Sequence, residues 1–288
     1  MTARRFAIWQ LVRVVILVGA FGSVVGSFLN VVVYRIPLHR SIVSPPSACP
    51  GCGARIKGYD NIPVLSWLLL RGDCRTCKSA ISMRYPFVEL GTGLFFAIVA
   101  WKFLPSAVSK LASTSFTGST LLLLVAFLYL AAVSVVLALI DLDTHNLPNR
   151  IVLPSYLVGL ALLGGAGFLS GDYGAMLRAG IGAAVLWLGY LSIALASSGG
   201  IGFGDVKLAG VLGLFLGYLG WDALITGAFA AFVLGGVFSI ALLLLHKANR
   251  KSGIPFGPWM LLGAWVGALF GEPIVHGYLS LFGLANGA

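Results

Sequence analysis

Two aspartates, Asp141 and Asp205, each lie at the end of a long apolar stretch in a chain with only nine acidic residues. The sequence reads VVLALIDLDTHNLPN around the first and GGIGFGDVKLAG around the second. A carboxylate at membrane depth is costly to desolvate, so its presence there indicates a functional role. Two carboxylates that share one proton can activate one water molecule, and this is the chemistry of an aspartyl peptidase.

In that chemistry the two carboxylates divide the work. The ionised carboxylate draws a proton from the water, and the protonated one polarises the scissile carbonyl group. Because the two groups interact, they titrate as a pair rather than singly. Gly202 and Gly204 beside Asp205 favour close passage of a substrate backbone.

The residues alone leave other interpretations of these acids open. Asp143 is a second candidate, but two positions along a helix turn it to another face, where a solvated or capping carboxylate is the simpler reading. The Asp141/Asp205 pair is also compatible with ion pairs to Arg150 or Lys207. A third possibility is cation coordination in a membrane transporter.

A second chemical signal is a quartet of cysteines, the only four in the chain. They form two CxxC pairs separated by 21 residues, namely Cys49-Pro-Gly-Cys52 and Cys74-Arg-Thr-Cys77. This spacing matches a four-thiolate zinc site, and four thiolates leave no position for water, so the predicted zinc is structural. Two disulfides are the alternative, which an expected location in the reducing cytosol disfavours.

The elements that must position these residues are membrane helices. The chain is 59% hydrophobic and 10% charged, with a mean hydropathy of +0.98, whereas a soluble domain carries about 25% charged residues. We therefore predict an all-α polytopic membrane protein with about eight transmembrane helices. Apolar runs of bilayer-spanning length lie at about 8–34, 86–104, 119–140, 151–170, 177–197, 205–220, 222–245 and 256–271. An apolar tail at 277–285 is too short to span.

The distribution of Lys and Arg predicts the orientation. The net charge of +10 fits the positive-inside rule better than nucleic-acid binding, and no nucleic-acid partner is expected. Cationic residues gather in segment 35–85 and at Lys247, Arg250 and Lys251, which places these parts in the cytoplasm and both termini outside. Both aspartates then lie near the cytoplasmic face, and lipid surrounds the protein.

We expect three parts: a first transmembrane helix (1–34), a cytoplasmic zinc-binding domain (35–85) and a membrane-embedded aspartyl peptidase core (86–288). Segment 35–85 is rich in Pro, Gly and basic residues, without helical periodicity, and suggests loops and hairpins. About fifty residues bury too little core to fold unaided, so the metal is expected to supply folding energy. No P-loop, HExxH or GxSxG motif is present.

Taken together, the motifs resemble those of type IV prepilin peptidases, the bifunctional prepilin leader peptidase/N-methyltransferases of bacteria. The resemblance covers most of the chain. Its motifs are, in order, GSFLNVVVYRIP at 26–37, the CPGC and CRTC pairs, NIPVLSWLLLRGDC at 61–74, ISMRYPFVEL at 81–90, DLDTHNLPNRIVLP at 141–154, GFGD at 202–205 and IPFGPWMLLGAW at 254–265.

This resemblance implies that Asp141 and Asp205 are catalytic. It implies cleavage of a basic leader after a Gly, from prepilins or pseudopilins, on the cytoplasmic side of the bacterial inner membrane. It leaves open the oligomeric state and the system served, whether type IV pilus, type II secretion or DNA uptake. We also expect the leader to be contacted through the backbone of segment 35–85 and through acids such as Asp60 and Asp73.

The resemblance alone implies the second activity, N-methylation of the new N-terminal residue, usually Phe, with S-adenosylmethionine. A peptidase without methylation is the alternative. Glu89 is the only acid in the second span, where a polar contact with another helix is the competing explanation. The candidates for the methyl-donor site, taken from family-matching positions, are Asn30, Arg35, Asn61, Arg84 and Glu89.

Overall fold

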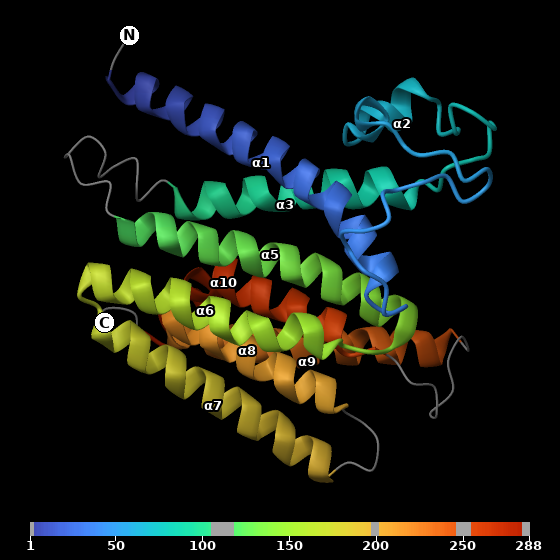
Figure 1. The fold of residues 1–288 in the computed structure, drawn as a ribbon. Helices are drawn as coiled ribbons and strands as arrows, with labels where there is room; N and C mark the ends of the chain where they lie inside the picture. The colour runs from blue at the N-terminus through green and yellow to red at the C-terminus, as the bar shows by residue number, and fades with distance from the viewer. Residues whose placement is uncertain (1–2, 105–117, 197–201, 246–254, 284–288) are drawn as a thin grey trace. The chain divides into compact units, whose positions relative to one another are not determined.

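Eight long helices account for most of the described chain (Figure 1). The structure is a computed structural model that describes residues 3–104, 118–196, 202–245 and 255–283. The predicted cytoplasmic cations Lys247, Arg250 and Lys251 lie outside these residues. The long helices are α1 (Ala3–Arg35), α3 (Arg84–Phe103), α5 (Gly118–Thr144), α6 (Asn149–Ser170), α7 (Tyr173–Ala196), α8 (Phe203–Leu219), α9 (Trp221–Leu244) and α10 (Gly257–Leu281).

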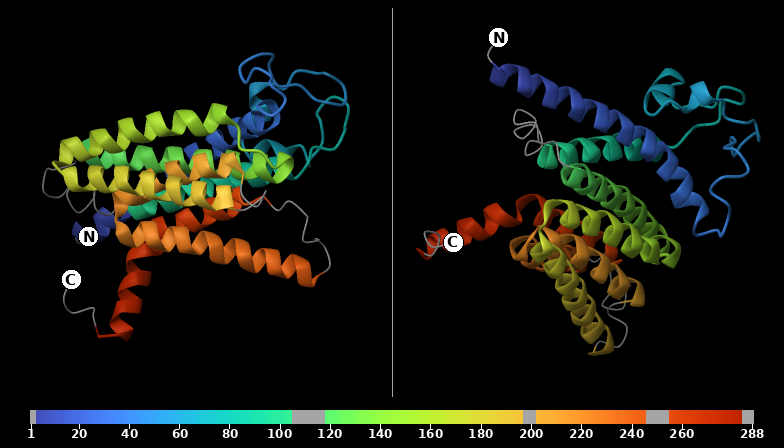
Figure 2. Two further views of the ribbon diagram at one scale, coloured as in Figure 1. Left: turned by 90° about the horizontal axis from the view of Figure 1, so that it is seen from below. Right: turned by 60° about the vertical axis from the view of Figure 1, so that its left-hand side comes forward.

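Each of the eight predicted apolar runs is helical, which confirms the all-α architecture. Seven of the helices in the described residues are long and apolar enough to cross a membrane. The exception is α8, whose 17 residues extend about 25 Å at about 1.5 Å per residue, less than a hydrocarbon core of about 30 Å. The predicted tail at 277–285 is not a separate segment, because α10 continues to Leu281. Pro273 lies within α10, and Figure 2 shows this helix bent along its length.

The chain divides into two compact units, to both of which α5 contributes. The first comprises Met1–Thr120 and Phe127–Val136, and the second comprises Leu121–Ala126 and Leu137–Ala288. In the first unit α1 packs along α3. A Cβ atom on Gly22 would lie only 2.6 Å from Phe96 Cβ, so the absence of a side chain on α1 allows the close approach of α3.

In the second unit the short helix α8 is surrounded by the others. It packs most extensively against α7 and also contacts α6, α9 and α10. Nearly every residue from Val206 to Gly217 is buried. A Cβ atom on Gly213 would lie against the carbonyl oxygen of Gly182 on α7, so these helices meet backbone to backbone. Such contacts between small residues hold helices together where lipid offers no hydrophobic driving force.

The segment between α1 and α3 is mostly irregular. Its regular parts are a short 3₁₀ helix, η1 (Gly58–Asn61), and the five-residue helix α2 (Leu65–Leu69). Two isolated antiparallel bridges, Ala48 with Arg55 and Asp73 with Ala80, complete it. The sequence analysis predicted loops and hairpins here but no helix. A helix of five residues is too short to produce a readable hydrophobic period.

Candidate active site

Asp141 lies in the last turn of α5 and is only 4% exposed. Its Oδ2 atom accepts a hydrogen bond of 3.1 Å from the backbone N–H of Gly257, the first residue of α10. The first N–H groups of a helix have no partner within the helix and favour an anion. Asp143, two residues further on, is exposed, as the helical period predicted.

The contact with Gly257 requires a residue without a side chain. A Cβ atom on Gly257 would lie 2.6 Å from Asp141 Oδ2 and 3.3 Å from its Cγ. The next residue, Pro258, has no backbone N–H and therefore cannot donate a hydrogen bond to the Asp141 carboxylate. The IPFGP sequence therefore gives α10 a single amide directed at Asp141.

Asp205 lies in the first turn of α8, where it accepts the N–H of Gly202 at 3.1 Å. It is partly exposed, unlike Asp141. Both aspartates lie close to the Leu147 side chain, which is near Gly204, the neighbour of Asp205, and near Gly257, which binds Asp141. The structure therefore brings together the two aspartates that the sequence singled out, although 64 positions separate them.

Leu147 lies between the two helix starts next to this pair. A Cβ atom on Gly204 would lie 3.1 Å from Leu147 Cβ, and one on Gly257 would lie 3.4 Å from Leu147 Cδ2. The buried Leu147 side chain thus lies between the first turn of α8 and the first residue of α10. The end of α5 and the starts of α8 and α10 converge at one end of the second unit.

The ion-pair alternative for these aspartates is not seen in the described part of the chain. Lys207 Nζ donates to Asn149 Oδ1 on α6 at 3.0 Å, and its carbonyl accepts the Tyr156 hydroxyl at 2.6 Å. Neither aspartate is paired with Lys207 or Arg150 among the described residues. Both cations leave the carboxylates available for other chemistry.

An aromatic cluster that sequence reasoning missed lies beside the carboxylates. The Tyr190 ring lies 5.4 Å from that of Phe232 and 6.2 Å from that of Phe256, centroid to centroid. Phe256 directly precedes Gly257, whose N–H binds Asp141, so the cluster adjoins this carboxylate. The three rings come from different helices or helix junctions, so no local pattern marks them.

In the first unit, the four cysteines form one cluster that could hold a metal ion. Their Sγ atoms all lie within 4.8 Å of one another, and Cys49 Sγ is 3.7 Å from Cys77 Sγ. Tetrahedral coordination with Zn–S bonds of about 2.3 Å separates the sulfurs by about 3.8 Å. The cluster therefore has the donor set and the dimensions of a four-thiolate zinc site.

The two CxxC pairs are built alike, which the sequence analysis did not detect. In each pair, the backbone N–H of the first cysteine donates to the carbonyl five residues later, Ala54 for Cys49 and Ser79 for Cys74. The carbonyl of the same cysteine accepts the N–H four residues later, that of Gly53 or Lys78. The fourth residue after each first cysteine has a positive φ, +70° at Gly53 and +59° at Lys78. Two copies of one turn thus face one another across the sulfur atoms.

The Ser79 hydroxyl contacts two of the sulfurs, Cys77 Sγ at 3.1 Å and Cys49 Sγ at 3.5 Å. Its hydrogen bond, together with those of the backbone at Cys52 and Gly51, lowers the pKa of Cys49 to about 6, and it also lowers the pKa of Cys77. Thiolates are the metal-binding form of cysteine, so this hydroxyl favours the state that a metal requires.

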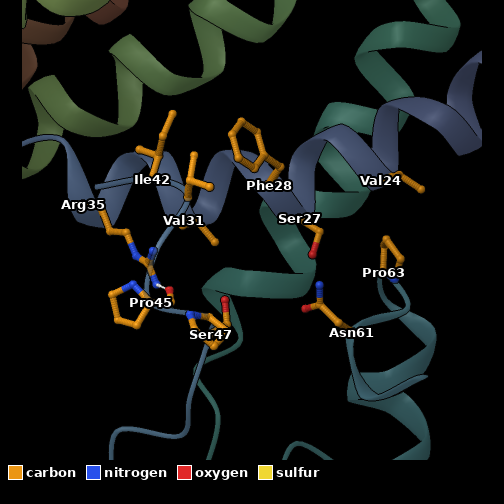
Figure 3. A pocket seen from close by; sticks show the side chains of 12 residues that line it. Val24, Ser27, Phe28, Val31, Arg35, Ile42, Pro45, Ser47, Asn61 and Pro63 are labelled. Carbon is orange, nitrogen blue, oxygen red and sulfur yellow. Dashed lines mark hydrogen bonds between the residues drawn. The ribbon is translucent and has the colours of Figure 1, made fainter. Parts of the chain in front are cut away.

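The methyl-donor candidates have separate roles in the first unit. Arg35 and Asn61 line a pocket of about 320 Å³ (Figure 3). Asn30 Nδ2 donates to the Tyr85 carbonyl at 3.3 Å, which ties α1 to α3. Glu89, only 9% exposed, accepts the backbone N–H of Val64 at 2.7 Å. Arg84 begins α3.

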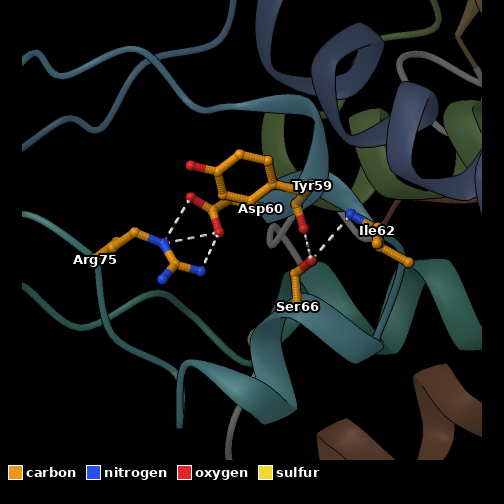
Figure 4. Close-up of polar contacts among 5 residues, drawn as sticks. All are labelled: Tyr59, Asp60, Ile62, Ser66 and Arg75. Atoms are coloured by element: carbon orange, nitrogen blue, oxygen red, sulfur yellow. Dashed lines mark hydrogen bonds and ion pairs between the residues drawn. The ribbon is translucent and has the colours of Figure 1, made fainter.

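Asp60 is engaged within the small domain. Arg75 donates to both of its carboxylate oxygens, with a shortest distance of 2.6 Å (Figure 4). The Asp60 side chain is 11% exposed, and the Arg75 guanidinium lowers the pKa of this carboxyl group. A leader peptide that contacts Asp60 would therefore meet a carboxylate already paired with Arg75.

Comparison with known proteins finds matches over nearly the whole chain. The profile of the Bacterial Peptidase A24 N-terminal domain matches residues 20–103, and that of the Type IV leader peptidase family matches residues 128–240. The first match covers the cysteine cluster, and the second covers both aspartates. No solved structure matches the chain.

Several curated relatives share the name "Prepilin leader peptidase/N-methyltransferase". The protein from Aeromonas salmonicida is 38% identical over 92% of this chain and 93% of its own length. Those from Pseudomonas aeruginosa and Neisseria gonorrhoeae are 35% and 33% identical, over 91% and 87% of this chain and 92% and 88% of their own. This multi-pass membrane protein therefore belongs to the type IV leader peptidase family, the family of the prepilin leader peptidase/N-methyltransferases.

Proposed function

We propose that this protein cleaves the basic leader from type IV prepilins or pseudopilins with Asp141 and Asp205. The cleavage takes place at the cytoplasmic side of the bacterial inner membrane. The observation that carries the proposal is the convergence of the two carboxylates, with Asp141 held by the Gly257 amide and Asp205 by the Gly202 amide. The names of the relatives support the same activity.

In this mechanism the pair holds a single proton. The ionised carboxylate takes a proton from a water molecule whose oxygen attacks the scissile carbonyl carbon, while the protonated carboxylate gives its proton to the carbonyl oxygen. The tetrahedral intermediate then breaks its C–N bond, and the leaving amine takes up a proton from the pair. The partly exposed Asp205 provides the side from which water enters.

Substitution of each aspartate by asparagine tests the peptidase proposal. Asn keeps the size of the side chain but cannot exchange a proton, so Asp141→Asn and Asp205→Asn are each expected to reduce prepilin cleavage to background. The matched control is Asp143→Asn, which is expected to retain cleavage because Asp143 is exposed. Unchanged cleavage by either of the first two variants would refute the assignment. A transporter would show no cleavage by the unmodified protein.

We further propose that the cysteine cluster holds a structural Zn²⁺ through Cys49, Cys52, Cys74 and Cys77. The sulfur separations support this assignment. The metal contributes folding energy to segment 35–85 and takes no part in the peptide cleavage. The proposed functional division is the one expected from the sequence: helix 1–34, zinc-binding domain 35–85 and peptidase core 86–288.

The second proposed activity is N-methylation of the new N-terminal residue with S-adenosylmethionine, supported by the names of the relatives. The donor supplies an electrophilic methyl group: the free amine forms the new C–N bond, the sulfur keeps the electrons of the broken C–S bond, and the amine proton passes to water. To test the two activities separately, the purified protein is incubated with a prepilin and the donor, and the masses of both products are measured. Cleavage without a mass gain of one methyl group would favour the peptidase-only alternative.

A further inference from the structure

A pocket of about 320 Å³ lies between α1 and the irregular segment that follows it (Figure 3). One wall is a single face of α1, formed at positions i, i+3, i+4, i+7 and i+11 by Val24, Ser27, Phe28, Val31 and Arg35. The other wall is formed by residues 42–47 together with Asn61 and Pro63. The volume falls at the lower end of the range for sites that bind small molecules. A cavity in the second unit, of about 10 Å³, is too small for such a ligand.

We propose that this pocket binds the methyl donor, S-adenosylmethionine. This inference rests on the proposed methyl transfer and assigns its site. The donor combines a carboxylate, a flat adenine ring and a sulfonium cation. The pocket offers a guanidinium, an aromatic ring, two serine hydroxyls and one side-chain amide, which is a matching set.

Arg35 binds the carboxylate of the methyl donor in this proposal. Its Nη1 donates to the Ser41 carbonyl at 3.0 Å and its Nη2 to the Pro45 carbonyl at 2.7 Å. A guanidinium has five N–H donors, so these two bonds fix its position and leave others for a ligand. Among the residues that the structure describes, no acid lines the pocket, and an anionic group meets no repulsion from them.

Phe28 and Asn61 serve the rest of the ligand. Phe28 is half-exposed at 50%, and an aromatic face of this kind attracts a sulfonium cation or stacks on adenine. The Asn61 and Ser27 side chains point toward each other from opposite walls (Figure 3). Together they supply donors and acceptors for the ribose hydroxyls.

The wall that carries Asn61 is held in a strained conformation. Val64 has a φ of +62°, which is a rare and costly state for a β-branched residue. Its N–H donates to the buried Glu89 carboxylate at 2.7 Å, and the Ser66 hydroxyl accepts the Ile62 N–H at 3.0 Å (Figure 4). Strain of this kind persists where the surroundings enforce it, and it is typical of binding sites. Glu89 is thus a positioning residue for the pocket wall.

The test measures binding of radiolabelled S-adenosylmethionine to the full-length protein in detergent, alongside leader cleavage and methylation. Val31→Trp fills the pocket and is expected to abolish binding and methylation while leader cleavage continues. Asn61→Ala is expected to weaken binding about 10-fold, the effect of losing a polar contact to the ligand. Ile16→Trp is the matched control, because Ile16 is 63% exposed on the same helix and outside the pocket.

A second pair of variants tests the role of Glu89 in the same binding assay. Gln keeps an oxygen that can accept the Val64 N–H, whereas Ala does not, so Glu89→Gln is expected to retain donor binding and Glu89→Ala to lose it. Unchanged binding and methylation in both Val31→Trp and Asn61→Ala would overturn the pocket assignment. If the unmodified protein cleaves but neither binds nor uses the donor, the proposed methyl transfer itself fails.

Discussion

The glycine at the start of α10 gives the sharpest test of how the active site is built. In Gly257→Ala, the new methyl carbon would lie 2.6 Å from Asp141 Oδ2, whereas ordinary contact begins at 3.4 Å. Either the carboxylate or the first turn of α10 must therefore move by about 0.8 Å, the difference between these two distances. The movement also stretches the 3.1 Å hydrogen bond that holds Asp141.

The size of the effect follows from this displacement. Misplacing a reacting group by about 1 Å lowers a rate about 100-fold, which corresponds to about 2.7 kcal/mol of transition-state stabilisation. Because Gly257 touches the carboxylate and not the expected leader, the loss should appear in kcat rather than in KM. The assay is cleavage of a purified prepilin over a range of substrate concentrations, which gives kcat and KM separately.

The matched control is Gly236→Ala in α9, in the same unit. A Cβ atom there meets nothing within 4 Å, so this variant is expected to cleave at the rate of the unmodified protein. Cleavage by Gly257→Ala within about twofold of that rate would refute the reasoning, since a loss of about 100-fold is expected. Equal losses in both variants would show a general effect of the substitution and not a displaced carboxylate.

Four further outcomes are expected in the cysteine cluster. Ser79→Ala removes the hydroxyl beside Cys49 and Cys77 and should weaken zinc binding about 10- to 100-fold, measured by competition with a chelator; unchanged affinity would contradict this role. Lys78→Gly should raise the unfolding free energy of the metal-bound protein by about 0.5–1 kcal/mol, because Lys78 has a positive φ, whereas Gly53→Ala should lower it by about as much. Removal of zinc with a chelator should increase proteolysis of segment 35–85 without unfolding the helices, as measured by circular dichroism; a loss of helix content would refute it.

The sequence predicted the parts of this fold that depend on local pattern. Long apolar runs identify the helices because only a helix satisfies its own backbone groups in lipid. The helical period separates the buried Asp141 from the exposed Asp143. The spacing of the cysteines was also sufficient to predict a cluster, because two short turns determine where four sulfur atoms lie.

The missed features all depend on contacts between distant positions. The bond from Gly257 to Asp141 joins residues 116 positions apart, and nothing in either local sequence indicates it. The bond from Val64 to Glu89 crosses from an irregular segment to a helix, whereas the alternative considered for this donor-site candidate was a contact with another helix. The repeat of the two CxxC turns went unnoticed because Gly53 and Lys78 differ chemically while sharing a backbone conformation.

The short length of α8 has a consequence for how the enzyme responds to its lipid environment. A helix about 5 Å shorter than the hydrocarbon layer would normally thin the bilayer around it. However, α8 is enclosed by other helices of its unit, so lipid chains meet those longer helices instead. The space left by the shorter α8 can therefore hold water next to Asp205, and the lipid boundary has no hydrophobic mismatch there. We expect membranes of different thickness to change the tilt of the outer helices and to leave the depth of the hydrolytic centre unchanged.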